Sequence, residues 1–144
     1  MTEPEALASD LRVVIGQLVR RLRAERRDLS LAQVTVLGRL DRVGPCGVSD
    51  LAAGERVRPQ SMASTVAALL AGGLVSRAPD PGDRRRVLIA LTPAGREALA
   101  VDRRRREGWL ADAIRGDLSP KEQRALADAA VLLSRIAESG DTRR

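Results

Sequence analysis

The most informative segment of the sequence is residues 57–91, which read VRPQSMASTVAALLAGGLVSRAPDPGDRRRVLIAL. Pro59 stands where proline favours the first position of a helix, and apolar residues from Met62 to Leu69 follow at helical spacing. The glycines at 72–73 end this helix. Its opposite face carries short or neutral hydrogen-bonding groups near the start, namely Gln60, Ser61, Ser64 and Thr65. The segment therefore begins with an amphipathic helix whose outer face is polar.

A β-hairpin is expected directly after this helix. Residues 74–77 and 87–91 are β-prone, and the turn-forming residues at 80–82 lie between them. Three consecutive arginines follow the turn at 84–86. A short helix over 48–53, joined to the polar helix by a tight turn, completes a helix-turn-helix pattern. Together with the hairpin, this order of elements predicts a winged helix.

Longer helices are expected on both sides of this unit, at about 5–27, 31–42, 93–115 and 120–139. Capping residues precede three of them, namely Ser30, Thr92 and Ser119. The helices at the two chain ends carry apolar stripes, although the central unit already has its own core. A second copy of the chain would cover these stripes, but they could instead cover the core of one monomer. The residues expected at such a dimer interface are Leu11, Leu18, Leu126, Leu133 and Ile136.

The charge of the chain is concentrated in its middle third. The 144 residues carry 25 basic and 19 acidic groups, for a net charge of +6. Residues 56–106 hold eleven arginines and four acids, for +7, and the remainder of the chain sums to −1. A general bias of the composition toward arginine would explain why the basic residues are arginines and not lysines. It does not explain why the excess positive charge lies in one segment. The pattern favours a polyanionic partner such as nucleic acid.

The composition also excludes several classes of protein. The chain has no His, Tyr or Phe and a single Cys, which removes His-based catalysis, Cys/His metal sites and disulfide frameworks. We therefore expect no enzyme, no metal and no cofactor. With 44% hydrophobic residues, a mean hydropathy of −0.18 and acids in its first ten positions, it is expected to be a cytoplasmic protein with neither a signal segment nor a membrane span.

The order of these parts resembles the MarR family (multiple antibiotic resistance regulators) of bacterial transcription factors. The similarity covers about residues 29–99, and its motifs are specific through their order and spacing together. They are LSLAQ at 29–33, VSDLA at 48–52, VRPQSM at 57–62, GLVSR at 73–77, DPGDRR at 80–85 and LTPAGR at 91–96.

The resemblance implies a homodimer that places each recognition helix in a major groove of a pseudopalindromic operator and each wing in the flanking minor groove. Arg58 would then lie beside the DNA backbone, and the outer face of the recognition helix, Gln60, Ser61, Ser64 and Thr65, would contact bases or phosphates. Many family members have a basic residue where this chain has Ser64. The recognition helix is therefore neutral after Arg58, so either more of the electrostatic affinity comes from the wing or small polar groups read the bases.

In the wing, the resemblance implies that Asp83 steadies Arg85, which enters the minor groove. Arg77 would complete this ionic cluster, or it would form a plain surface salt bridge. Arg84 and Arg86 would contact phosphates.

The family also implies control by a small aromatic or phenolic effector that releases DNA. Trp109, the only aromatic residue, could line the effector pocket or pack in the dimer core. Because His, Tyr and Phe are absent, a pocket here is expected to consist of aliphatic residues, arginines and one tryptophan. Cys46 lies in a loop flanked by Gly and Pro, and we interpret it as an inert thiol.

The sequence thus predicts a mainly α fold with a small β-hairpin wing, in a single domain over residues 1–144. The winged helix-turn-helix would span about 30–92, and the dimerisation helices about 5–27 and 93–139. The predicted function is sequence-specific binding of double-stranded DNA as a homodimeric repressor. The alternative is a winged-helix dimer that acts as a protein-interaction module without reading DNA.

Overall fold

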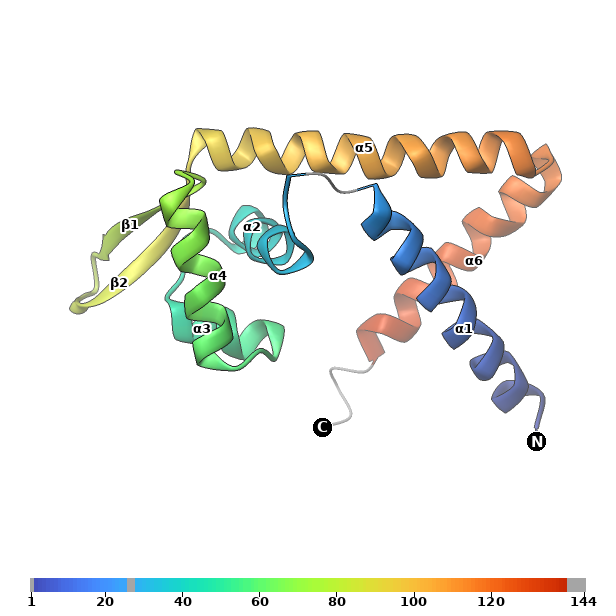
Figure 1. Ribbon diagram of the computed structural model, residues 1–144. Coiled ribbons are helices and arrows are strands. Elements are labelled where there is room, and N and C mark those ends of the chain that lie inside the picture. The colour runs from blue at the N-terminus through green and yellow to red at the C-terminus, as the bar shows by residue number, and fades with distance from the viewer. Residues whose placement is uncertain (1, 26–27, 140–144) are drawn as a thin grey trace. The chain divides into compact units, whose positions relative to one another are not determined.

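The computed structural model describes residues 2–25 and 28–139, and within them it contains six helices and one antiparallel hairpin (Figure 1). The elements are α1 Glu3–Ala24, α2 Leu31–Val43, α3 Val48–Glu55, α4 Pro59–Ala71, β1 Val75–Asp80, β2 Asp83–Leu91, α5 Pro93–Asp117 and α6 Pro120–Ser139. The predicted mainly α fold with a hairpin wing is confirmed. The chain divides into two compact units, residues 1–106 and 107–144, and α5 contributes to both. The predicted boundary after Thr92 does not coincide with this division.

The predicted capping residues define the starts of three helices. The Ser30 hydroxyl accepts a hydrogen bond from the backbone amide of Gln33, and the side-chain carbonyl of Gln33 accepts one from the backbone amide of Ser30. Ser119 and Glu122 form the same reciprocal pair, and Thr92 accepts from the amide of Gly95. Each pair satisfies amides that the first turn of a helix leaves without partners.

Several helix boundaries differ from the prediction by one or two residues, including the end of α2 at Val43 and the end of α5 at Asp117. A further capping box between Thr2 and Glu5 makes α1 begin at Glu3, and α1 ends at Ala24. The predicted end of this helix at 26–27 lies outside the described residues. The helix α3 continues to Glu55, and Arg56 then turns the chain in a left-handed conformation with φ of 54°. The helix-turn-helix is therefore tighter than the sequence suggested.

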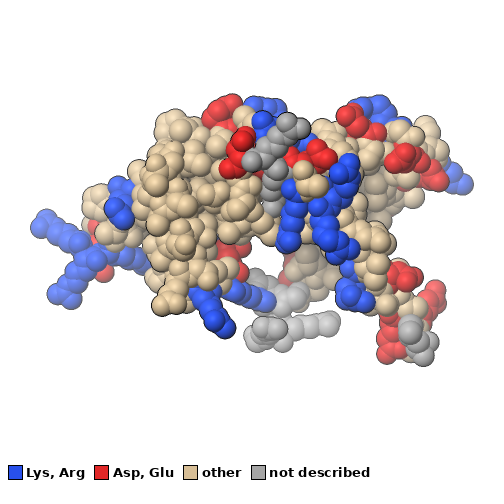
Figure 2. Space-filling view, viewed as in Figure 1, with Lys and Arg blue, Asp and Glu red and all other residues tan. Residues whose placement is uncertain are grey.

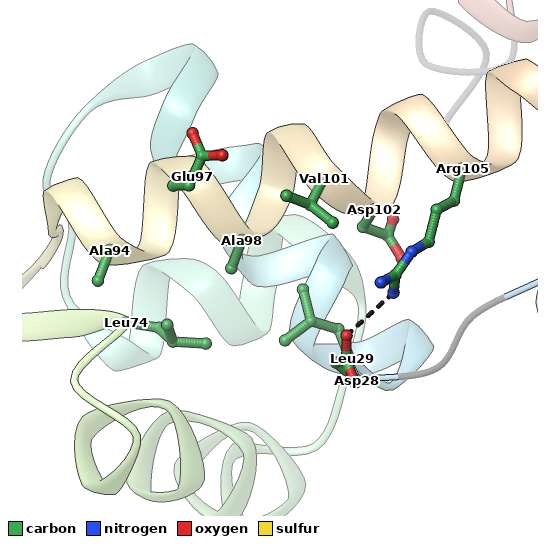
Figure 3. A pocket seen from close by; sticks show the side chains of 9 residues that line it. All are labelled: Asp28, Leu29, Leu74, Ala94, Glu97, Ala98, Val101, Asp102 and Arg105. Atoms are coloured by element: carbon green, nitrogen blue, oxygen red, sulfur yellow. Dashed lines mark hydrogen bonds and ion pairs between the residues drawn. The ribbon is translucent and has the colours of Figure 1, made fainter.

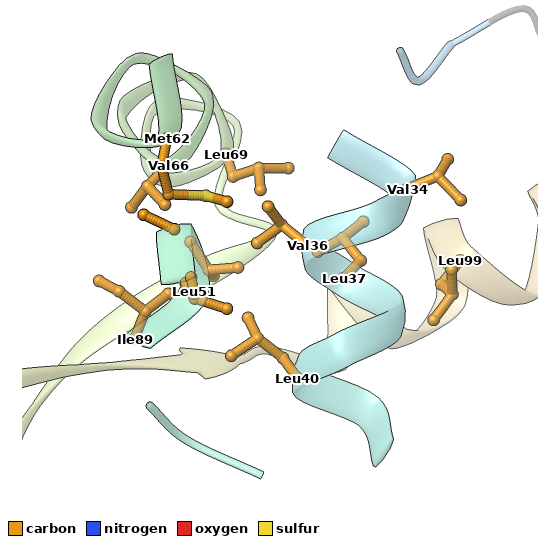
Figure 4. Packing of buried hydrophobic residues seen from close by; sticks show 12 residues of the cluster. Val34, Val36, Leu37, Leu40, Leu51, Met62, Val66, Leu69, Ile89 and Leu99 are labelled. Carbon is orange, nitrogen blue, oxygen red and sulfur yellow. The ribbon is translucent and has the colours of Figure 1, made fainter. Parts of the chain in front are cut away.

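One apolar core holds the winged unit together (Figure 4). It takes residues from α2, α3, α4, both strands and the first half of α5. Its largest fully buried side chains are Leu37, Leu51, Leu69, Ile89 and Leu99. Burial of a leucine-sized side chain stabilises a fold by about 1.5–3 kcal/mol relative to exposure. This core therefore fixes how α4 and the hairpin lie relative to each other.

The hairpin is reinforced by a third backbone segment that the sequence did not indicate. Its register runs from Val75 opposite Leu91 to Pro79 opposite Val87. The loop residue Cys46 forms an isolated antiparallel bridge with Ile89, through amide-to-carbonyl hydrogen bonds of 3.1 and 2.8 Å. This bridge ties the base of the hairpin to the loop before α3.

The junction between α4, the hairpin and α5 is held by hydrogen bonds of Thr92 and by a close approach of two backbone segments. The Thr92 hydroxyl donates to the carbonyl of Gly73 at 2.7 Å, and the Thr92 amide donates to the carbonyl of Leu74 at 3.2 Å. A Cβ atom at Gly95 would lie only 1.9 Å from that Leu74 oxygen. Glycine at 95 is therefore required for the close approach of α5 to the backbone at Leu74.

This junction predicts opposite effects for two glycine-to-alanine changes in α5. Gly95→Ala is expected to lower the free energy of unfolding by about 1–3 kcal/mol, because the backbone must shift to admit the methyl group. Gly108→Ala meets no atom within 4 Å and is expected to raise it by about 0.5–1 kcal/mol through helix propensity. Urea denaturation of both variants tests this, and equal effects would contradict the close approach at Gly95.

Candidate nucleic-acid interface

The outer face of α4 is polar, and its side chains are available for contact. Gln60, Ser61 and Ser64 are exposed, whereas Met62, Val66 and Leu69 on the opposite face are buried in the core. Thr65 is half-buried, and its hydroxyl donates to the carbonyl of Ser61 at 3.1 Å. Thr65 therefore has its hydroxyl proton already engaged, although its oxygen can still accept a hydrogen bond.

The N-terminus of α4 lacks a side-chain cap. Arg58 is the N-cap residue, with extended φ and ψ of −61° and 140°, and makes no capping hydrogen bond; Pro59 follows at the first helical position. The free amides and the helix dipole at such an end favour negative charge. Together with the exposed Arg58 side chain, this end of α4 presents positive potential beside the polar face.

Asp83 steadies Arg85 through the main chain. Oδ1 of Asp83 accepts from the backbone amide of Arg85 at 3.0 Å, and Asp80 holds the turn in the same way through the amide of Gly82. Among the ion pairs of residues 2–25 and 28–139, none joins Asp83 to Arg77 or Arg85. Neither the ionic cluster of Arg77 with Asp83 nor the alternative surface salt bridge of Arg77 is found among these ion pairs, and the contact of Asp83 with Arg85 is to the main chain.

Arg77 lies instead between the hairpin and α4. It lines a shallow cavity of about 250 Å³ together with Val87 of β2 and Ala63 and Ala67 of α4. The side chain is exposed. Arg77 thus lies where the hairpin meets α4.

Arg86 contacts another part of the protein. Its guanidinium forms an ion pair with Asp50 of α3, a partner that the sequence analysis did not identify. This pair lies next to the bridge between Cys46 and Ile89 and fastens the hairpin further. Both side chains remain partly exposed, so the pair leaves Arg86 accessible from solvent. A phosphate contact by Arg86 stays a prediction.

The positive charge of the central segment is less uniform than the sequence suggested. On α5, every arginine from Arg96 to Arg106 is paired with a carboxylate, including Arg96 and Arg103 with Asp41 and Arg104 with Glu97. In the described part of the chain, no ion pair is found for four arginines of α4 and the hairpin, Arg58, Arg77, Arg84 and Arg85. We call these four residues the unpaired arginine group. Figure 2 shows basic side chains projecting from the hairpin at the left of the view.

Cys46 has the properties of a structural thiol. Burial raises its pKa, and the nearby guanidinium groups of Arg39 and Arg86 offset only part of this effect. At neutral pH the side chain is therefore a thiol rather than a thiolate, which is the less reactive form. Its backbone meanwhile bridges to Ile89, which gives this position a role in the hairpin.

A second feature of the winged unit is a cavity of about 480 Å³ beside α5 (Figure 3). Its apolar wall consists of Leu29, Leu74, Ala94, Ala98 and Val101. Its polar residues are Asp28, Glu97, Asp102 and Arg105. Trp109, the predicted pocket residue, is half-buried in the second unit and is not among the described residues that line this cavity. The three carboxylates were not anticipated from the sequence.

The helices α1 and α6 each carry an apolar face that the described chain does not cover. Neither helix has a fully buried residue. Of the predicted interface residues, Leu18 is 42% and Ile136 is 63% exposed, Leu126 is also exposed, and Leu11 and Leu133 are half-buried. Large exposed apolar surfaces of this kind are typical of protein contact sites.

None of the described helices is long and apolar enough to cross a membrane. Across the same residues, no three acidic or cysteine side chains gather so that they could hold a metal ion.

The comparisons with known proteins agree with this geometry. The model of the MarR family matches residues 29–87. An HTH-type transcriptional regulator of Mycobacterium tuberculosis is 37% identical over 134 residues, which cover 92% of this chain and 93% of the relative. A Pseudomonas aeruginosa protein assigned as a transcriptional regulator superimposes with a TM-score of 0.83 at 35% identity, over 96% of this chain and 97% of that one. The chain belongs to the MarR family and is a DNA-binding transcriptional regulator.

One solved relative carries information about regulation. Its structure describes how DNA binding by BpsR of Bordetella bronchiseptica is regulated by 6-hydroxynicotinic acid. It is 27% identical, with a TM-score of 0.60, over 87% of this chain and 98% of BpsR.

Proposed function

We propose that this regulator is a homodimeric repressor that reads a pseudopalindromic operator in double-stranded DNA. The observation that carries the proposal is the unpaired arginine group, which borders the polar outer face of α4. Phosphates would offset the four guanidinium charges, and the small polar groups of α4 would face base edges in the major groove. Arg84 and Arg86 would contact phosphates, and Arg85 would enter the narrow minor groove, where the negative potential is strong.

The dimer is supported by the exposed apolar faces of α1 and α6. A second copy offers the same faces and can bury them in a symmetric interface. A symmetric dimer would place two recognition helices on two half-sites of the operator. The DNA lies in the cytoplasm of bacteria, so we propose that compartment for the protein, and no catalytic step is part of its role.

A small aromatic or phenolic effector in the cavity beside α5 would control operator binding. The volume of about 480 Å³ is within the range of small-molecule sites. The cavity is lined by Leu74 and Ala94, which flank the junction between α4, the hairpin and α5. A ligand there would contact this junction, which sets the positions of α4 and the hairpin.

A second candidate function is a winged-helix dimer that binds another protein. The neutral outer face of α4 after Arg58 favours it, because such a face can pack against protein as well as DNA. This candidate predicts partner binding that depends little on salt, whereas DNA binding weakens steeply as counterions return to the phosphates.

Selection of bound fragments from the source genome tests the repressor proposal. We expect enrichment of sites with two half-sites about 10 base pairs apart, centre to centre. Four unpaired arginines per chain should give a slope of log affinity against log salt approaching about −7 for a dimer. Absence of sequence enrichment, combined with binding that is insensitive to salt, would favour the protein-interaction role.

A further inference from the structure

One arginine of the hairpin is held by a carboxylate of the helix-turn-helix. Of Arg84, Arg85 and Arg86, only Arg86 forms an ion pair within the described chain, with Asp50 in the first turn of α3. The side chains of Arg86 and Asp50 are 42% and 55% exposed. The pair therefore lies at the surface of the winged unit, where another anion can reach the guanidinium.

The Arg86 side chain is also packed against the start of α3. A Cβ atom at Gly47, the N-cap residue of α3, would lie 3.1 Å from both Nε and Nη2 of Arg86. The bridge between Cys46 and Ile89 holds the backbone of the hairpin next to this contact. Two contacts thus keep the Arg86 charge beside α3, namely the ion pair with Asp50 and the packing over Gly47.

Asp50 lies on the helix that would be nearest to the DNA backbone. In a helix-turn-helix, the first helix crosses the backbone while the second helix lies in the major groove. The first helix here is α3, and Asp50 is in its first turn. A phosphate that approaches this turn would therefore compete with the Asp50 carboxylate for the guanidinium of Arg86.

We propose that Asp50 is a specificity-determining residue that keeps Arg86 from the phosphates of DNA other than the operator. Non-specific complexes depend on contacts between phosphates and basic side chains. Phosphates that are only loosely placed do not displace a carboxylate that already contacts the guanidinium. Asp50 therefore removes one phosphate contact per chain from non-specific binding.

In the operator complex, a wing seated in the minor groove holds a phosphate at a fixed position beside Arg86. The guanidinium then exchanges Asp50 for this phosphate, which an exposed ion pair is weak enough to allow. The inference rests on the proposed repressor function and concerns how the same surface discriminates between DNA sequences.

The salt dependence of binding by Asp50→Asn tests the inference. The probes are an operator fragment from the genomic selection and a random-sequence duplex of the same length, measured by fluorescence anisotropy. Release of Arg86 should steepen the slope of log affinity against log salt on the random duplex by about 0.9 per chain, or about 2 for a dimer. The loss of that affinity between about 50 and 200 mM salt would then grow roughly tenfold. On the operator the slope should stay the same, because Arg86 already contacts a phosphate there.

Two controls show whether Asp50 acts through Arg86. In a protein that also carries Arg86→Ala, Asp50→Asn should leave the slope on the random duplex unchanged, because no guanidinium is released. Glu55→Gln removes the same charge from the other end of α3, where Glu55 pairs with Arg39 of α2 at 3.2 Å. This variant should change neither slope.

Several results would overturn the inference. One is a steeper slope that persists with Arg86→Ala or appears equally in Glu55→Gln, because the lost negative charge would then act directly on DNA. Equal steepening on both duplexes would mean that Asp50 does not discriminate between them. An unchanged random-duplex slope in Asp50→Asn, with operator binding intact, would reject this inference alone. If the unaltered protein does not distinguish the operator from the random duplex, the repressor proposal fails and this inference fails with it.

Discussion

Replacing Ile136 by aspartate is expected to convert the proposed dimer into a monomer and to weaken operator binding by more than about 100-fold. Ile136 is 63% exposed on the apolar face of α6, so a second copy would bury it. A carboxylate at that position would lose its hydration without gaining a partner, which opposes association. The monomer would then contact one half-site and lose the advantage of two linked binding events. Sedimentation equilibrium gives the mass, and anisotropy gives the operator affinity.

Val43 provides a matched control for this experiment. It is 61% exposed, much like Ile136, but lies at the end of α2 and belongs to neither of the two helices that carry the apolar faces. Val43→Asp is therefore expected to keep both the dimer mass and the operator affinity. A dimer that persists in Ile136→Asp would show that the apolar face of α6 is not the interface.

Replacing Arg85 by alanine is expected to weaken operator binding by about 1–3 kcal/mol, which is roughly 5- to 150-fold. Arg85 belongs to the unpaired arginine group, so its charge is not compensated inside the protein. Ser64→Ala removes one neutral hydroxyl from the outer face of α4 and is expected to have a smaller effect. Fluorescence anisotropy on operator DNA compares the two variants at one salt concentration.

Arg96 supplies the control for charge alone. Its guanidinium is already paired with Asp41, at 2.9 Å, and it lies on α5 outside the predicted interface. Arg96→Ala removes the same formal charge as Arg85→Ala but should leave operator affinity nearly unchanged. Equal losses in the two variants would mean that the net charge of the protein, and not a groove contact of the wing, controls binding.

Much of the fold followed from local signals. The capping pairs at Ser30 and Ser119 and the proline at 59 gave helix starts that the structure confirms. Helical spacing of Met62, Val66 and Leu69 also gave the buried face of α4 correctly. These signals are local because a cap or an amphipathic stripe involves residues within a few positions of one another.

The features that could not be predicted depend on residues far apart in the chain. The pairing of Arg86 with Asp50 and the carboxylates of the cavity involve elements that only the tertiary fold brings together. The arginines at 103–106 looked like part of a polyanion surface, yet each is held by an acid of α2, α5 or the loop before α2. A charge count along the sequence records the sign of a segment and does not show which charges are already compensated.

The bridge between Cys46 and Ile89 has an entropic consequence for recognition. A two-stranded hairpin alone is only marginally stable in water, so its tip would sample many conformations. The bridge and the ion pair of Arg86 with Asp50 restrict these conformations when the chain folds. The hairpin then loses its conformational entropy when the chain folds and not when it binds DNA. The wing is therefore preorganised for binding. Loosening the bridge would therefore reduce the affinity for DNA without altering any side chain that is proposed to contact DNA.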